Sequence, residues 1–128
     1  MTLQHEQTIR LLIVNERKEI IEAIGRFVAQ FPHVNVVGTA HTLEDSVQCA
    51  RDLQPSAVLC DYQKLKTQTL ERIRQLRAIL PDACIIAMSY DDDQADEVLA
   101  AGATQFIAKF NLGQQLMPAL DQCGRQPP

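Results

Sequence analysis

Short apolar runs alternate along this chain with segments in which apolar residues recur every three or four positions. A continuous apolar run indicates a strand covered on both faces, whereas the longer period indicates a helix with one buried side. The predicted strands are residues 9–14, 34–40, 57–60, 84–88 and 105–108. A helical pattern follows each of them, so the chain reads as five consecutive pairs of strand and helix.

Proline, glycine and capping residues mark the ends of the predicted helices. Pro32, Pro55 and Pro81 each follow a helical segment, and proline stops a helix because it lacks a backbone N–H. Thr42 is expected to cap the second helix, and Gly102 to end the fourth. The remaining boundaries are a polar loop over residues 62–68, a fifth helix opened by Asn111 and its end at Gly124.

Strands that alternate with helices through short connections predict a parallel sheet, because parallel neighbours need crossover connections. We therefore predict an α/β fold, a flavodoxin-like (βα)5 doubly wound parallel sheet with strand order 2-1-3-4-5. A length of 128 residues fits one domain with one core. The domain is predicted to span residues 1–124, with residues 125–128 as a tail or the start of a linker.

Composition and charge limit the range of possible functions. The net charge of -4 disfavours nonspecific DNA binding by this domain alone. No apolar stretch approaches the ~18 residues of a membrane span, and the first residues lack the basic and apolar regions of a signal peptide. A cytoplasmic protein without membrane contact is expected.

The cysteines show no metal or redox spacing. Cys49, Cys60, Cys84 and Cys123 lie far apart, without a C-x-x-C pair or a histidine at ligand spacing. Four reduced thiols that act as small apolar side chains are therefore expected.

Three predicted strands end on polar side chains: Asp61 after the third, Ser89 after the fourth and Lys109 after the fifth. The carboxyl ends of parallel strands share one edge of a sheet, so an acid, a hydroxyl and an ammonium are expected in one crevice. This set suits a phosphoryl group. Asp61 would be the nucleophile that forms an aspartyl phosphate, and Lys109 and Ser89 would stabilise the phosphoryl oxygens.

A metal is expected at the same crevice. In the order 2-1-3-4-5 chain order reverses between the first and third strands, whose ends carry Asn15, Glu16 and Asp61. Glu16 and Asp61 are hard oxygen ligands of the kind that suits Mg²⁺, which keeps several waters. The Asn15 amide beside them would be a weak or indirect ligand.

Over roughly residues 9–120 the chain resembles the receiver domain of two-component response regulators, in the style linked to helix-turn-helix output domains. Residues 34–40 (VNVVGTA), 55–61 (PSAVLCD) and 101–109 (AGATQFIAK) are similar to that family's patterns. The resemblance implies that Asp61 is the phosphoacceptor, and that Ser89 and Lys109 contact the phosphoryl group. It also implies that Phe106 is an aromatic switch and that the backbone carbonyl of Gln63 binds the metal.

The resemblance also implies partners. A histidine kinase or a small phosphodonor would supply the phosphoryl group, and the domain would signal rather than act as an enzyme. A homodimer is expected through the face of the fourth helix, fifth strand and fifth helix. DNA would be contacted only through an output domain absent from this chain.

Departures from the family's pattern leave alternatives open. The usual acidic pair is Asn15-Glu16 here, the loop after Asp61 is unusual, and Phe110 replaces a common proline. One alternative is an atypical receiver that serves as a phosphorylation-independent interaction module. A phosphohydrolase with an aspartate nucleophile would need an acid where Gln63 stands. Flavin binding would need a Ser/Thr/Gly-rich loop after the first strand.

Overall fold

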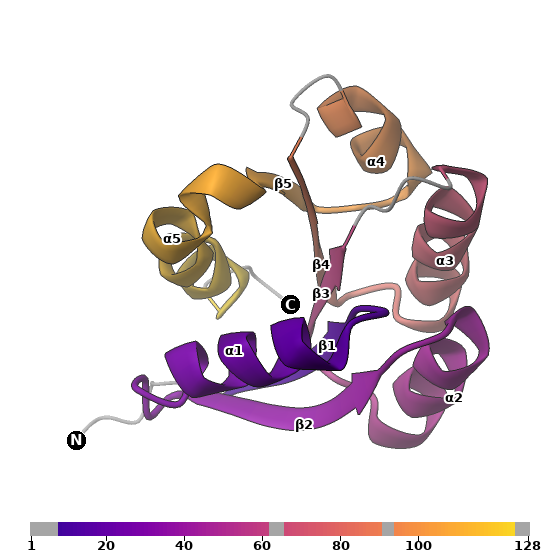
Figure 1. Ribbon diagram of the computed structural model, residues 1–128. Coiled ribbons are helices and arrows are strands. Elements are labelled where there is room, and N and C mark those ends of the chain that lie inside the picture. The colour runs from indigo at the N-terminus through magenta and orange to yellow at the C-terminus, as the bar shows by residue number, and fades with distance from the viewer. Residues whose placement is uncertain (1–7, 62–65, 91–93, 125–128) are drawn as a thin grey trace.

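The computed structural model describes residues 8–61, 66–90 and 94–124 (Figure 1). The strands are β1 (Ile9–Val14), β2 (Val34–Ala40), β3 (Ala57–Asp61), β4 (Cys84–Ser89) and β5 (Gln105–Ala108). The helices are α1 (Lys18–Val28), α2 (Leu43–Leu53), α3 (Lys66–Ile79), α4 (Ala95–Ala101) and α5 (Leu112–Gly124), with a 3-10 turn η3 (Lys109–Asn111) before α5. The strands form one parallel sheet in the order β2-β1-β3-β4-β5, which confirms the predicted fold.

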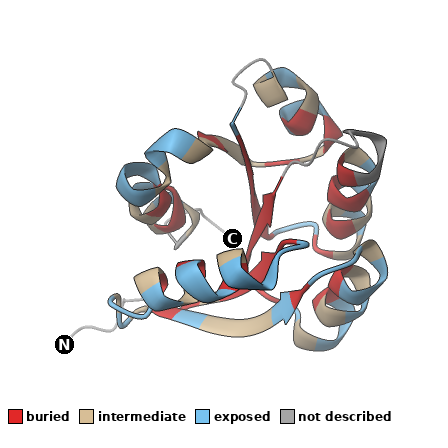
Figure 2. Ribbon diagram, viewed as in Figure 1, coloured by how far each residue is buried: buried red, intermediate tan, exposed pale blue. Residues whose placement is uncertain are grey.

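Helices cover both faces of the sheet. Helices α1 and α5 pack on one face, and α2, α3 and α4 on the other (Figure 1). Every residue of β3 and β4 is buried, whereas the outer sides of the helices are exposed (Figure 2). The continuous apolar runs arise because the central strands have a helix layer on each side. The strand ends are therefore held rigidly from both faces.

Most boundaries follow the sequence signals. The Thr42 hydroxyl accepts a hydrogen bond from the backbone N–H of Asp45 at 3.0 Å, which is the expected cap of α2. Gly102 ends α4 with φ 125°, a conformation that favours glycine. Strands β3 and β4 each extend one residue beyond the prediction, and α5 begins one residue after Asn111.

The largest boundary error lies before α3. This helix begins at Lys66, inside the predicted polar loop 62–68. Residues 66–68 contain neither proline nor glycine, so the helix extends by nearly a turn ahead of its apolar stripe. Polarity alone therefore did not indicate a loop. Within the described ranges, no helix has the length and apolar character to cross a membrane.

A disulfide joins Cys84 to Cys123, with their Cα atoms 5.5 Å apart. The prediction of four reduced thiols is wrong for this pair, while Cys49 and Cys60 are free. The two bonded residues are 39 positions apart in the chain. They meet because α5 packs on the sheet with its last turn beside the start of β4, a contact that sequence spacing does not reveal.

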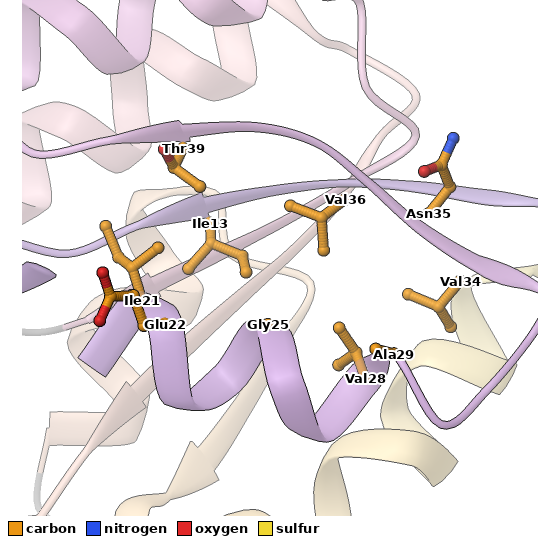
Figure 3. A pocket seen from close by; sticks show the side chains of 10 residues that line it. All are labelled: Ile13, Ile21, Glu22, Gly25, Val28, Ala29, Val34, Asn35, Val36 and Thr39. Carbon is orange, nitrogen blue, oxygen red and sulfur yellow. The ribbon is translucent and has the colours of Figure 1, made fainter. Parts of the chain in front are cut away.

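A groove of about 450 Å³ lies between α1 and the edge strand β2 (Figure 3). Its walls are mostly apolar, and Gly25 on α1 leaves space, because a Cβ there would meet no atom within 4 Å. Glu22 and Thr39 supply polar groups at one end. None of the residues lining this groove is one of the predicted site residues, so it is separate from the strand-end crevice.

Candidate functional site

The carboxyl ends of four strands bring the predicted site residues to one edge of the sheet. Asp61 is the last residue of β3 and Ser89 the last of β4, while Lys109 follows β5 directly. Asn15 and Glu16 follow β1, which pairs with β3. Because these strands are hydrogen-bonded neighbours in parallel, their ends lie side by side at one edge of the sheet, where the crevice is predicted.

Asp61 and Lys109 form an ion pair through Oδ1 and Nζ. Asp61 is buried, at 3% exposed, whereas the Lys109 side chain retains 19% of its surface in water. Burial raises the pKa of Asp61 above its ordinary value of 3.8. The bond to Lys109 and a hydrogen bond from Asn15 lower that pKa, and the nearby Glu16 carboxylate raises it. Removal from water is the largest of these effects.

Asn15 is fully buried and makes two side-chain hydrogen bonds. Its Nδ2 donates to Asp61 Oδ2 at 3.1 Å, and its Oδ1 accepts from the backbone N–H of Arg17 at 2.9 Å. The Arg17 bond fixes the amide's orientation, because only the oxygen can accept. Asn15 therefore presents its N–H donor to the Asp61 carboxylate, and its role as a weak or indirect metal ligand stays a prediction.

The metal prediction depends on Asp61, Glu16 and Gln63. Glu16 is exposed at the mouth of the crevice, and its carboxylate lies close enough to Asp61 to act on that residue's pKa. Gln63 lies outside the described residues. No group of three or more His, Cys, Asp or Glu side chains in the described part of the chain is arranged to hold a metal. Two carboxylates do fit Mg²⁺, which is commonly held by one or two of them and several waters.

Ser89 is buried, and its hydroxyl donates to Gln94 Oε1 at 2.6 Å. Gln94 occupies the N-cap position of α4, so this bond connects the end of β4 to the start of that helix. Sequence reasoning missed Gln94. The only signal for it was its position just ahead of the predicted helix, five residues after Ser89.

Two exposed aromatic rings border the crevice. Tyr90 and Phe110 lie directly after Ser89 and Lys109, and their ring centroids are 5.2 Å apart. They are 64% and 81% exposed. Lys109 Nζ lies 4.7 Å from the centroid of the Tyr90 ring. The ammonium thus contacts a carboxylate and an aromatic face.

Phe106, the predicted switch, is half-buried on β5. It packs against the core on the face covered by α2, α3 and α4. It also lines a groove of about 240 Å³ between β5 and α5. The switch role stays a prediction.

The comparisons with known proteins agree with one another. A family model described as the response regulator receiver domain matches residues 11–121. Response regulator GacA of Pseudomonas viridiflava is 32% identical over 103 residues, which cover 79% of this chain and 48% of that protein. Transcriptional regulatory protein LiaR of Bacillus subtilis (strain 168) is 25% identical over 122 residues, covering 94% of this chain and 58% of that protein. The chain spans about half the length of these curated relatives.

Solved structures share the fold. A two-component response regulator of the LuxR family from Aurantimonas sp. SI85-9A1 superposes with a TM-score of 0.84 at 21% identity, covering 92% of this chain and 86% of that chain. The response regulator domain of Thermotoga maritima CheB gives 0.83 at 21% identity, covering 95% and 100%. At this identity the likeness extends to the fold alone.

Proposed function

Since the chain belongs to the response regulator receiver family, we propose that it accepts a phosphoryl group on Asp61 as a step in two-component signalling. The observation that carries this proposal is a buried carboxylate paired with Lys109 at the ends of the central strands. A charged acid has no packing reason to stand there, because burial works against its ionised form. Such a cost is typical of functional positions.

The proposed reaction is a phosphoryl transfer. A carboxylate oxygen of Asp61 attacks phosphorus and forms an acyl phosphate. The bond to the leaving group breaks at the same time, releasing acetate from acetyl phosphate or the imidazole of a phosphohistidine in a kinase. Lys109, already at the carboxylate, balances the charge of the phosphoryl oxygens.

Ser89 would complete the site by changing partner. Its hydroxyl donates to Gln94 here, and rotation toward a phosphoryl oxygen would break that bond. Gln94 precedes α4, so occupation of the crevice would loosen one connection between β4 and that helix. The change would spread to Phe106 and the face formed by α4, β5 and α5, where we place the homodimer contact.

Mg²⁺ fits this proposal. Glu16 and Asp61 are the carboxylates that would hold it, with the Gln63 carbonyl assigned by resemblance only. When bound, the ion would neutralise charge on the phosphoryl oxygens. Asn15 supplies a hydrogen bond in place of a second buried carboxylate, so weak binding is expected.

The relatives support a proposal for the wider setting of the domain. We place the receiver in residues 1–124 of a longer cytoplasmic protein, because the chain spans about half of its curated relatives. Several relatives are named as transcriptional regulators, so an output domain that binds DNA is the proposed target of the signal. A histidine kinase or a small phosphodonor is the proposed source.

One observation favours a second candidate, an interaction module that works without phosphorylation. Asn15 already holds Asp61 Oδ2 by a hydrogen bond, and Lys109 holds Oδ1. These bonds hold both carboxylate oxygens of Asp61 within the protein. In this alternative Asp61 would be structural.

Intact-protein mass spectrometry separates the two candidates. The domain would be incubated with acetyl phosphate and MgCl₂, beside Asp61→Asn and Lys109→Ala variants. We expect one added phosphoryl group on the wild type, none on Asp61→Asn and a strongly reduced amount on Lys109→Ala. An unchanged wild-type mass, also with a cognate phosphorylated kinase, would favour the interaction module.

A further inference from the structure

The Lys109 ammonium lies between two groups of different chemistry. On one side it pairs with the Asp61 carboxylate. On the other it faces the Tyr90 ring, with Nζ 4.7 Å from the centroid. That distance is within the ~6 Å over which a cation is attracted to the electron-rich face of an aromatic ring.

The Tyr90 ring is itself held by a second ring. Phe110 contacts it with centroids 5.2 Å apart and planes inclined by 55°. Both side chains are largely exposed, and neither belongs to the two core clusters. The pair therefore does not contribute to the core. The pair adjoins the Lys109 ammonium through the Tyr90 ring.

A lysine at a charged site benefits from such support. Its four-carbon stem has many rotamers, and holding the ammonium in one place opposes their entropy. A ring over the cation restricts those rotamers without adding a competing acceptor. The ammonium is then already in place when charge arrives in the crevice, so no reorganisation is needed.

We propose that Tyr90 is a positioning residue for Lys109, and that Phe110 fixes the Tyr90 ring over the ammonium. The geometric part of this inference is independent of phosphorylation. Its consequence for rate rests on the proposed function: Lys109 held at Asp61 assists phosphoryl transfer to that carboxylate. In this role Tyr90 acts on the transfer through Lys109, whose Nζ its ring adjoins.

The geometric part is tested by NMR on the unphosphorylated domain. Protons above an aromatic face are shifted upfield, so the Lys109 Hε resonances are expected upfield of those of exposed lysines. Tyr90→Phe keeps the ring and should keep the shift, whereas Tyr90→Leu should abolish it. Phe110→Leu should reduce it. Leu99→Ala, which removes another exposed apolar side chain, is the control and should leave it unchanged.

The rate of phosphorylation by acetyl phosphate tests the consequence. Tyr90→Leu should lower it about two- to five-fold, the size of one exposed cation–π contact, and Tyr90→Phe should stay near wild type. An unshifted Lys109, or a shift that survives Tyr90→Leu, would overturn the positioning role. If Tyr90→Leu abolishes the Lys109 shift but leaves the phosphorylation rate unchanged, the proposed effect of Tyr90 on phosphoryl transfer is overturned. A wild type that takes no phosphoryl group would refute the proposed function, while the NMR result would still decide the geometry.

Discussion

Asp61 and Glu16 are two carboxylates that differ in burial because of their positions. Both follow strands at the same crevice, but Asp61 is buried and Glu16 is exposed. Burial raises the pKa of Asp61, and the bonds from Lys109 and Asn15 do not fully offset it. The native protein therefore binds a proton at Asp61 more tightly than the unfolded chain does, so ionised Asp61 opposes folding.

Because of this difference, we predict that Asp61→Asn raises the free energy of unfolding by an amount that depends on pH. The contribution of Asp61 to stability falls as pH rises from about 3.8 through its higher native pKa, and stays low at neutral pH. The variant should therefore have the larger free energy of unfolding near neutral pH, with the gap closing toward acid. Urea denaturation of both proteins at a series of pH values measures the gap. A variant less stable than wild type at neutral pH would contradict the raised pKa of Asp61 in the native protein.

The two free cysteines, Cys49 and Cys60, are expected to differ in reactivity. Burial raises the pKa of Cys60 to about 12, against a lowering by Arg72, and Asp61 adds to the rise. Cys49 is only half-buried. We expect a thiol reagent at mildly alkaline pH to modify Cys49 but not Cys60 in the native protein.

Counting thiols tests the disulfide at the same time. Denaturation without a reductant should expose two reactive thiols, Cys49 and Cys60, and added reductant should expose all four. Mass spectrometry after alkylation gives both counts. Four alkylated cysteines in the unreduced sample would show that Cys84 and Cys123 are not bonded.

At the level of elements, the Arg77 side chain joins the end of α3 to the loop between α4 and β5. Its guanidinium donates to the carbonyls of Leu80, Pro81, Ala83 and Gly102 and to the hydroxyl of Thr104, at 2.8–3.1 Å. The Thr104 hydroxyl also accepts from the backbone N–H of Ile85 in β4. One side chain thus supplies donors to several carbonyls of irregular backbone, of which that of Leu80 also accepts from the backbone N–H of Ala83.

Removing this side chain should destabilise the domain. Arg77→Ala leaves those carbonyls without their donor, and we expect a loss of about 2–3 kcal/mol of unfolding free energy by chemical denaturation. Arg74→Ala is the matched control, because Arg74 is an exposed arginine on the same helix whose ion pair with Glu71 is long, at 3.8 Å. That control should change stability by less than about 0.5 kcal/mol. Equal effects from the two variants would contradict the role of Arg77.

The elements could be predicted from sequence where local signals are strong. Apolar runs located all the strands to within one residue, and Thr42 and Gly102 acted as the expected cap and terminator. Local signals failed where tertiary contacts decide. The pairing of Cys84 with Cys123 depends on how distant segments pack, whereas the start of α3 at Lys66 differs from the prediction because polar residues alone do not indicate a loop.

For the whole molecule, the order β2-β1-β3-β4-β5 is what brings the site together. It places the ends of β1, β3 and β4 side by side, so the crevice at Asp61 could be predicted from strand ends alone. Side-chain partners could not be predicted. The direction of the Asn15 amide, the bond from Ser89 to Gln94 and the Tyr90 ring over Lys109 depend on rotamers that sequence patterns do not specify.

The same architecture relates the crevice to the proposed signalling surface. Ser89 ends a buried strand and contacts Gln94 at the start of α4, while Lys109 begins the turn that leads into α5. Both groups proposed to contact the phosphoryl group therefore adjoin the edge of the face formed by α4, β5 and α5. A change at Asp61 would reach that face through short covalent connections.

Chemical trapping of the modified residue tests the central claim most directly. Borohydride reduces an acyl phosphate to an alcohol, so the phosphorylated aspartate becomes homoserine and tandem mass spectrometry can locate it. After treatment with acetyl phosphate and Mg²⁺, we predict homoserine at position 61 and no conversion in samples without a phosphodonor. Conversion at another carboxylate, or none with any phosphodonor, would contradict the proposal that Asp61 is the phosphoacceptor.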